Sequence, residues 1–210
     1  DDFQNQVGRR DSALLAYDKT TGAEVWKISP DFSHDSYMTP LVWTRNGERE
    51  VILATWKTLA GFSLSDGARR WKHPYPMQQI VPSPAVHGDC LFVSGGNKLP
   101  CPILAVRAPG PEALSETLWY NGKTGSSIVS PVCWDGLVFS TNHIGILTCR
   151  DAATGQIHWT KRLSARGLAS LVAGDGKVYA LDQEGTLQVF AADTTGNLLA
   201  THSFLENCAA

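Results

Sequence analysis

The feature that most constrains this chain is a repeat marked by tryptophan. Trp26, Trp71, Trp119 and Trp159 are 45, 48 and 40 residues apart, and Ala200 stands where a fifth tryptophan would fall, 41 residues further on. Self-similarity at a fixed period of this length is typical of proteins that build one supersecondary unit several times over. The chain is therefore expected to fold as a series of similar modules.

Each repeat carries two recurring phrases. A hairpin phrase precedes the tryptophan, as in AYDKTTGAEVW (16–26) and CRDAATGQIHW (149–159), but the copy before Trp119 is four residues longer and has lost the Asp-Thr-Gly. Upstream lie a Ser/Thr-Pro, an apolar pair, a polar turn and an alternating strand, as in SPAVHGDCLFVS from Ser83 and SPVCWDGLVFS from Ser130. One unit therefore reads as four strands, the last of which ends in tryptophan.

The predicted fold is an all-β propeller built from four-stranded antiparallel blades. The strands are short, rich in Val, Leu, Ile and aromatic residues, and bounded by Gly, Asp and Asn, and no segment of about 12 residues has a helical period. Four such strands every ~40–45 residues indicate propeller blades. About four and a half blades are expected in a single domain (1–210): a partial blade at 12–27, blades near 35–73, 80–120, 127–161 and 167–203, and a partial one at 204–210.

The number of blades allows two arrangements. The chain starts DDFQNQVGRR without an initiator Met, so we expect a processed product or an excised piece. In the favoured arrangement it is a segment of a seven- or eight-bladed propeller. In the other, the N-terminal strand pair completes a fifth blade and closes a small ring. An open arc would expose apolar flanks and strand edges.

The turn residues and the tryptophan have mechanical roles in the predicted blade. The turn aspartates can accept hydrogen bonds from backbone N–H groups one or two residues onward, and the turn glycines supply the positive φ of a tight hairpin. The ring can then cover the flank of the neighbouring blade, its indole N–H bonded to a backbone carbonyl and a small residue ten positions earlier leaving it room, as Gly61 does before Trp71. The structural docking residues predicted in this way are Ala16, Asp18, Gly22, Trp26, Gly67, Trp71, Trp119, Cys149, Asp151, Gly155, Trp159 and Gly196.

This pattern resembles the tryptophan-docking motif A-x-D-x-x-x-G-x-x-x-W of the pyrroloquinoline-quinone-type (quinoprotein alcohol dehydrogenase-like) propellers, a WD40-like class of bacterial repeat protein. Residues 16–26 fit at every fixed position, whereas 149–159 has Cys149 in place of Ala. The family includes eight-bladed quinone-dependent dehydrogenases and non-enzymatic relatives such as the lipoprotein of the outer-membrane barrel-assembly machinery. The resemblance implies a periplasmic or extracellular protein.

Composition excludes several classes of partner. Lysine and arginine number 18 against 20 aspartates and glutamates, a net charge of −2 without long runs of either sign, which argues against nucleic acid. No apolar run approaches the ~20 residues that span a bilayer. Five cysteines without a C-x-x-C are expected to be buried free thiols, although one disulfide bridge is the alternative.

Candidate ligand-binding residues lie on the loops that join successive blades and on those between the second and third strands, because these loops converge on one face. Hydrogen-bonding and aromatic groups around a central depression suit a protein or peptide partner, or a small polar ligand. Each has a plainer interpretation, such as a turn asparagine chosen for its backbone or a solvated cation. The candidates are His34, Asp35, Tyr37, Trp56, Lys57, Gln79, Asn97, Lys98, Asn142, His143, Arg166 and Asp182.

The sequence favours a non-catalytic binding or scaffold module, with no cofactor and no metal. The alternative is part of a quinone- and calcium-dependent alcohol or sugar dehydrogenase, but the resemblance would then imply an adjacent Cys–Cys pair and an inward Glu–Asn–Asp calcium set, and neither is found. Nucleophile and zinc signatures are also missing. A sugar-processing propeller would need paired carboxylates, and Asp35, Asp182 and Glu184 do not obviously pair.

Overall fold

A computed structural model describes residues 13–29, 36–55, 57–77, 80–110, 114–167 and 169–204, and their regular structure is all β. One sheet has two antiparallel strands, β1 (Leu14–Tyr17) and β2 (Glu24–Ile28), and four sheets have four. Their strands are β3 (Leu41–Arg45), β4 (Glu48–Thr55), β5 (Thr58–Ser63) and β6 (Arg69–Pro74); β7 (Ala85–His87), β8 (Cys90–Ser94), β9 (Cys101–Arg107) and β10 (Glu116–Gly125); β11 (Val132–Trp134), β12 (Leu137–Thr141), β13 (Ile146–Asp151) and β14 (Ile157–Arg162); and β15 (Val172–Gly174), β16 (Lys177–Leu181), β17 (Thr186–Ala191) and β18 (Leu198–Ser203).

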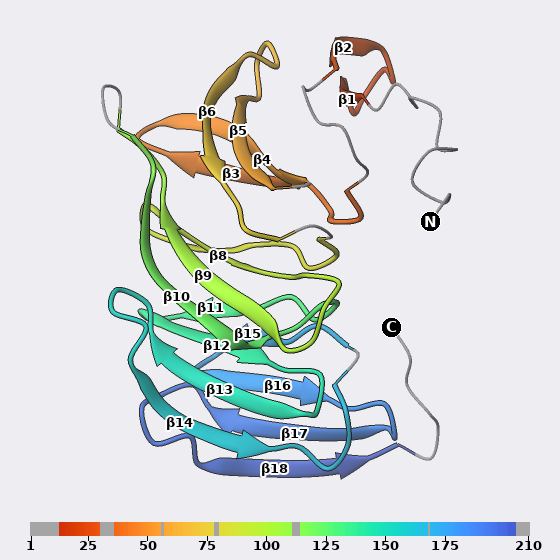
Figure 1. Cartoon of the computed structure of the whole chain (residues 1–210). Coiled ribbons are helices and arrows are strands. Elements are labelled where there is room, and N and C mark those ends of the chain that lie inside the picture. Colours follow the sequence, from red (N-terminus) through yellow and green to blue (C-terminus); the bar gives the residue numbers. More distant parts are fainter. Residues whose placement is uncertain are drawn as a thin grey trace, which may run out of the picture.

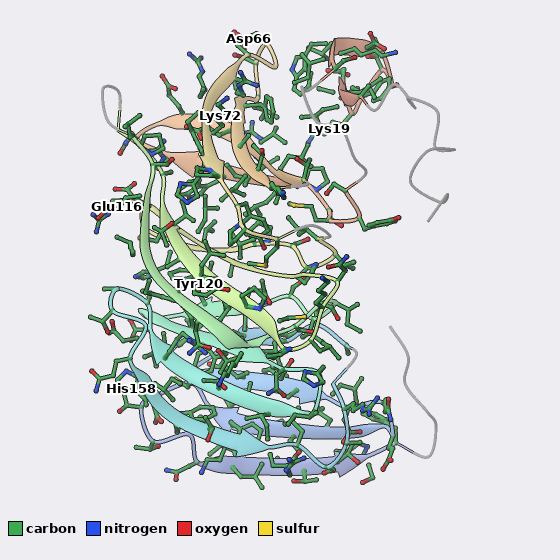
Figure 2. The ribbon with its side chains drawn as sticks, in the orientation of Figure 1. Lys19, Asp66, Lys72, Glu116, Tyr120 and His158 are labelled. Carbon is green, nitrogen blue, oxygen red and sulfur yellow. The ribbon has the colours of Figure 1, made fainter. Side chains whose placement is uncertain are left out.

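The sheets follow one another in chain order along an arc (Figure 1). Within each four-stranded sheet, every strand pairs with its neighbour in the sequence. The first strands contact one another from sheet to sheet, β7 with β11 and β11 with β15, so they lie nearest the common axis. Glu116, Tyr120 and His158, on the fourth strands β10 and β14, lie along the outer side (Figure 2). This confirms the predicted propeller architecture.

The core lies between the stacked sheets. Consecutive residues of β5 and β12 are buried, because a sheet on each side covers both faces of these central strands. On the outer strand β14 the tryptophan is the one buried residue. The last sheet is less covered: β17 is mostly half-buried and β18 is exposed throughout. Among the described residues, no helix has the length and apolar character needed to cross a membrane.

The hairpin turns have the side-chain hydrogen bonds that the sequence indicates. Asp151 Oδ1 accepts the backbone N–H groups of Ala153 (3.0 Å) and Thr154 (2.7 Å) and the hydroxyl of Thr154 (2.8 Å). The side-chain and then the backbone hydrogen bond of Thr154 lower the pKa of Asp151. Asp18 has the same arrangement with Thr20 and Thr21. These local bonds stabilise each turn independently of its contacts with the neighbouring sheet.

Three indole rings lie against the turn of the next sheet. Trp26 Nε1 donates to Leu64 O (2.9 Å), Trp119 Nε1 to Ala152 O (2.9 Å) and Trp159 Nε1 to Asp193 O (2.8 Å). Each acceptor precedes the turn glycine of the next sheet by three residues. A Cβ atom on those glycines would meet the ring, at 2.8 Å on Gly67, 2.7 Å on Gly155 and 2.3 Å on Gly196.

For three of the tryptophans, the small residue ten positions earlier is the partner across the sheet. Ala16 pairs with Trp26, Gly61 with Trp71, and Cys149 with Trp159. A Cβ on Gly61 would lie 2.3 Å from the Nε1 atom of Trp71. The ring therefore lies over its cross-strand neighbour, which explains why this neighbour is small.

A second set of contacts links the inner ends of the sheets. The Ser/Thr-Pro phrases meet there: Ser83 Oγ donates to Thr39 O (3.2 Å), and the N–H of Ser83 donates to Ser130 Oγ (3.0 Å). The N–H of Ser130 in turn donates to Ser170 Oγ (3.2 Å). These bonds link the four-stranded sheets to one another near the axis.

Two glycines allow backbone strain to be separated from ring packing. Gly22 and Gly155 have nearly the same positive φ, 72° and 73°, but a Cβ on Gly22 meets nothing within 4 Å. We expect Gly22→Ala to lower the free energy of unfolding by ~1 kcal/mol, the conformational term alone. Gly155→Ala should lower it by about 1–3 kcal/mol more, because Trp119 must move. Denaturant unfolding measures both, and equal losses would contradict the ring contact.

Candidate functional site

The two predicted classes of loop lie together at one end of the strands. The N–H of Lys57, between β4 and β5, donates to Met77 O in the loop that joins two sheets (3.0 Å). In the same way, Leu163 donates to Gly145 O (2.9 Å) and Gln183 to Arg166 O (2.9 Å). These backbone bonds hold the loops of the predicted binding face, which we call the loop face, against each other.

Most of the candidate side chains that the structure describes on the loop face are exposed. Tyr37 is 60% exposed, with its backbone N–H bonded to Ile80 O. Lys57, Asn97, Lys98 and Arg166 are also exposed. His34, Asp35, Trp56 and Gln79 lie outside the described residues. That these side chains bind a ligand stays a prediction.

Asp182 and Asn142 bond to the backbone of their own turns. Asp182 is 1% exposed; its Oδ1 accepts the N–H groups of Glu184 (3.0 Å) and Thr186 (2.9 Å), and its Oδ2 that of Ala165 (2.9 Å). Asn142 Oδ1 accepts two backbone N–H groups in the same manner. Both carboxylate oxygens of Asp182 therefore already accept hydrogen bonds from the backbone. Next to Asn142, the half-buried His143 has a buried Nδ1 without a hydrogen-bond partner in the described chain.

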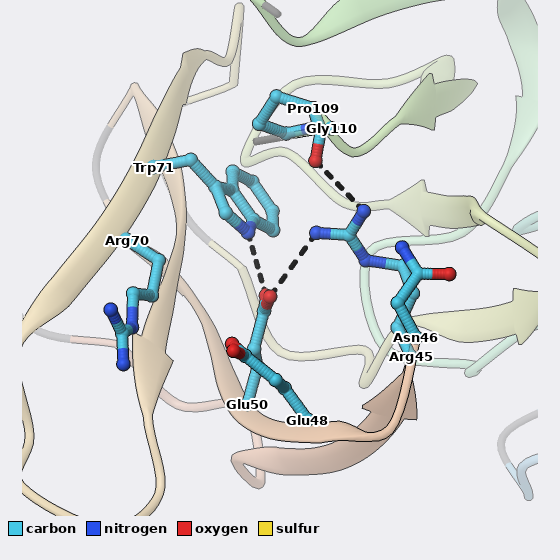
Figure 3. A pocket seen from close by; sticks show the side chains of 8 residues that line it. All are labelled: Arg45, Asn46, Glu48, Glu50, Arg70, Trp71, Pro109 and Gly110. Atoms are coloured by element: carbon cyan, nitrogen blue, oxygen red, sulfur yellow. Dashed lines mark hydrogen bonds and ion pairs between the residues drawn. The ribbon is translucent and has the colours of Figure 1, made fainter. Parts of the chain in front are cut away.

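A pocket of about 450 Å³ lies at the opposite end of the strands (Figure 3). It is formed by the β3–β4 turn, the strands β4 and β6, and the long loop between β9 and β10. We call it the Arg45 pocket. None of the residues that line it is among the ligand-binding candidates predicted from the sequence. Trp71 is the one lining residue that the sequence singled out, as a structural docking residue. The lining residues are Arg45, Asn46, Glu48, Glu50, Arg70, Trp71, Pro109 and Gly110.

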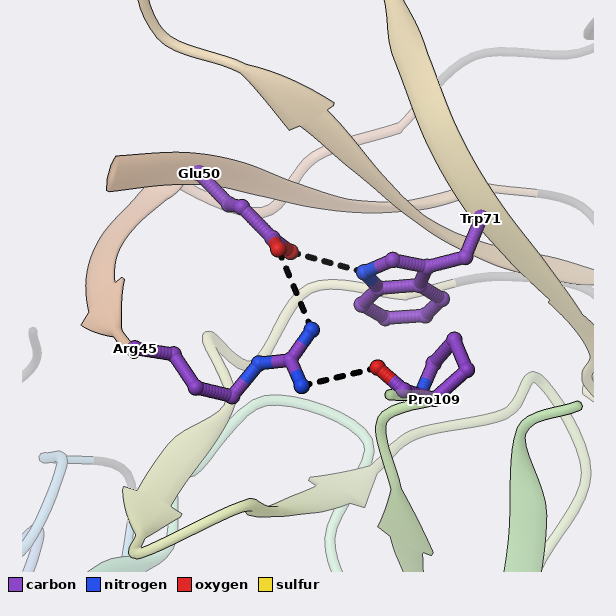
Figure 4. Close-up of polar contacts among 4 residues, drawn as sticks. All are labelled: Arg45, Glu50, Trp71 and Pro109. Atoms are coloured by element: carbon purple, nitrogen blue, oxygen red, sulfur yellow. Dashed lines mark hydrogen bonds and ion pairs between the residues drawn. The ribbon is translucent and has the colours of Figure 1, made fainter. Parts of the chain in front are cut away.

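A buried ion pair forms the floor of the Arg45 pocket (Figure 4). Glu50 Oε1 accepts Arg45 Nη2 at 3.1 Å, and Glu50 Oε2 accepts Trp71 Nε1 at 2.7 Å. Arg45 Nη1 reaches the next sheet and donates to Pro109 O (2.8 Å). The side chains of Arg45 and Glu50 are only 9% and 7% exposed. The charges of Arg45 and Glu50 thus compensate each other, and both carboxylate oxygens of Glu50 already accept a hydrogen bond.

The pocket is found where the repeat departs from its pattern. The other rings donate to a carbonyl in the Asp-type turn of the next sheet, but the sheet after Trp71 has the longer hairpin without Asp-Thr-Gly. Trp71 donates to Glu50 of its own sheet instead, and Arg45 makes the contact across to Pro109. Trp71 is thus the exception among the predicted docking residues. The irregular third copy of the hairpin phrase is the sequence feature that could have indicated this pocket.

The four cysteines that the structure describes show no sign of an activated thiol. Cys90, Cys101, Cys133 and Cys149 are free, and Cys208 lies outside the described residues. Burial raises the pKa of Cys133 and of Cys149 to about 12. Within the ranges that the structure describes, no three His, Cys, Asp or Glu side chains come together as metal ligands would.

The repeated sheets, the indole contacts and the polar loop face define a β-propeller of the quinoprotein-like repeat class. The sequence model of the family described as outer membrane protein assembly factor BamB matches residues 5–112 and 103–201. The chain belongs to this family.

Solved structures share the fold at low sequence identity. BamB from Moraxella catarrhalis has a TM-score of 0.67 at 19% identity, over 95% of this chain and 58% of that one. The quinohemoprotein alcohol dehydrogenase from Comamonas testosteroni also has a TM-score of 0.67, at 13% identity, over 93% of this chain and 41% of that one. The chain thus spans a little more than half of the BamB structure and less than half of the dehydrogenase. No curated protein matches the sequence significantly.

Proposed function

We propose that this chain is a non-catalytic scaffold of the periplasm that binds a protein partner during the assembly of outer membrane proteins. Its membership of the family described as outer membrane protein assembly factor BamB supports this role. The stacked sheets supply the rigidity that such a role needs, since loops fixed by backbone hydrogen bonds lose little entropy on binding.

The observation that carries the proposal is the charge of the loop face. Lys57 and Lys98 are exposed on the β4–β5 and β8–β9 loops, and Arg166 is exposed on the loop that joins β14 to β15, although the whole chain has a net charge of −2. Of the two acids on the described loops of this face, Asp182 is buried and bonded to backbone, and Glu184 is exposed. We infer that the partner presents an acidic segment to this face, which charge complementarity would steer and orient.

The experiment combines photo-crosslinking with charge reversal. A photoreactive amino acid in place of Tyr37 is expected to crosslink a protein partner in the host cell. The triple substitution Lys57→Glu, Lys98→Glu and Arg166→Glu should reduce the crosslinked product at least tenfold, and added salt should weaken it further.

The matched control is Lys19→Glu, an exposed reversal on the β1–β2 turn at the other end of the strands (Figure 2). It should leave the crosslink unchanged. A crosslink that survives the triple reversal, or that Lys19→Glu removes equally, would contradict the proposed surface.

The alternative, a quinone-dependent dehydrogenase, is favoured only by the shared fold of the Comamonas testosteroni enzyme. The residues in hand do not fit the cofactor: the sequence has no adjacent cysteines, and the described acidic residues form no cluster of three with other metal ligands. Addition of pyrroloquinoline quinone with calcium is expected to give neither a spectral shift nor dye reduction. Quinone-dependent dye reduction would overturn the scaffold assignment.

A further inference from the structure

One buried charge has no counter-charge in the described part of the chain. Arg150, on β13, is 0% exposed and is among the largest fully buried side chains. Its guanidinium lies over the ring of Trp119, with Cζ 5.3 Å from the centroid, and Nη2 donates to Thr124 Oγ1 (2.6 Å). Both neighbours belong to β10, so the charge lies between two consecutive sheets.

Further polar atoms of this interface lack partners. Nε and Nη1 of Arg150 are buried and have no hydrogen-bond partner among the described residues, and the same holds for Oγ1 of Thr148. Thr148 precedes Arg150 by two residues in the same strand, so both side chains lie on the same face of the sheet. Thr124 Oγ1 accepts only Nη2 of Arg150 and donates its own proton to Asn121 Oδ1 (3.0 Å), so it satisfies neither Nε nor Nη1.

The fold itself does not require a charge at this position. In the other four-stranded sheets the corresponding place, next to the residue paired with the tryptophan or with Ala200, is occupied by Phe62, Val106 and Phe190. All three are buried. An arginine here adds two unmet N–H groups and a positive charge to an interface that its apolar counterparts fill without either. An isolated buried charge is strongly unfavourable unless an opposite charge compensates it.

Loss of a proton from Arg150 does not remove the buried charge. Burial lowers the pKa of Arg150 to about 10, so the guanidinium stays protonated near neutral pH. The adjacent Cys149 opposes this shift but carries no charge there, because its own pKa is raised to about 12. The compensation must therefore come from outside the groups that the structure places around Arg150.

We propose that Arg150 and Thr148 hold a small monovalent inorganic anion, of the chloride class, between the sheets β7–β10 and β11–β14. Nε–H and Nη1–H of the guanidinium and the hydroxyl of Thr148 are the donors, and the guanidinium supplies the opposite charge. The anion thereby joins these two sheets, with the Trp119 ring beneath the guanidinium. The site is independent of the partner surface on the loop face.

The test measures thermal unfolding of the whole chain in sodium chloride and in sodium gluconate at equal ionic strength. Since gluconate is too large for the interface, chloride should raise Tm by about 3 °C for each tenfold increase above its Kd. Arg150→Met should abolish this response, and Thr148→Val, which keeps the charge, should weaken it. Crystals grown in bromide should show an anomalous peak beside the guanidinium.

Arg107→Met is the matched control, because Arg107 makes an exposed ion pair with Glu116. It should keep the full chloride response. Equal Tm values in chloride and gluconate, or an equal response in Arg150→Met, would overturn the proposal. Water molecules in place of bromide at Nε and Nη1 would overturn it as well.

Discussion

Replacement of Trp159 by alanine should lower the free energy of unfolding by about 3–5 kcal/mol, the range for truncation of a buried aromatic side chain. The ring is 9% exposed and lies between Phe139 and Phe190, with centroids 5.8 Å and 6.1 Å away. Alanine would open a cavity on both sides and remove the donor to Asp193 O. Chemical denaturation with tryptophan-independent detection, such as far-UV circular dichroism, measures the loss.

Trp159→Phe separates the hydrogen bond from the packing. Phenylalanine keeps much of the ring but not the indole N–H, so we expect a loss of about 1–2 kcal/mol. A loss below 1 kcal/mol for Trp159→Ala would mean that the ring does not hold the last two sheets together. The role of tryptophan in joining the sheets would then have to be abandoned.

Glu50→Ala should be as damaging, about 3–5 kcal/mol, for a different reason. It leaves the buried guanidinium of Arg45 without its counter-charge and the indole N–H of Trp71 without its acceptor. Glu116→Ala is the matched control, since its ion pair with Arg107 is exposed and is expected to contribute at most ~1 kcal/mol. Urea unfolding curves of both variants give the comparison.

A double substitution tests the cause of this loss. Arg45→Met with Glu50→Gln removes both charges and keeps an amide oxygen for Trp71, so it should recover most of the stability lost in Glu50→Ala. If the double variant is no more stable than Glu50→Ala, the unpaired charge is not the reason. Packing of the Arg45 pocket would then be responsible instead.

The irregular third repeat links the fold to the Arg45 pocket. Where the turn of the next sheet keeps its aspartate and glycine, a backbone carbonyl three residues before the glycine accepts the indole N–H, as at Leu64, Ala152 and Asp193. Beside the longer third hairpin, which has no aspartate, Arg45 of the buried ion pair makes the contact to the next sheet, and a polar recess is left. A repeat protein can in this way gain a local site without altering its architecture.

Sequence alone was enough for the features that depend on residues close in the chain. The period of the tryptophans indicated four-stranded modules, and the Asp and Gly positions indicated turns, because a side chain that bonds two or three residues onward does so in any surroundings. The small residue opposite each ring also follows from hairpin register, which the turn determines.

Tertiary structure decided what depends on residues far apart. Sequence placed Asp182 among the ligand candidates, but packing buries it under backbone donors, one of them from Ala165 in another loop. Nor could the sequence predict the hydrogen-bond acceptor of Trp71, the hydrogen bond from Arg45 to Pro109, or the buried charge of Arg150 without a counter-charge among the described residues. The physical reason is that such contacts join residues 17 to 64 positions apart in the sequence. Only the stacking of whole sheets determines which of these side chains meet.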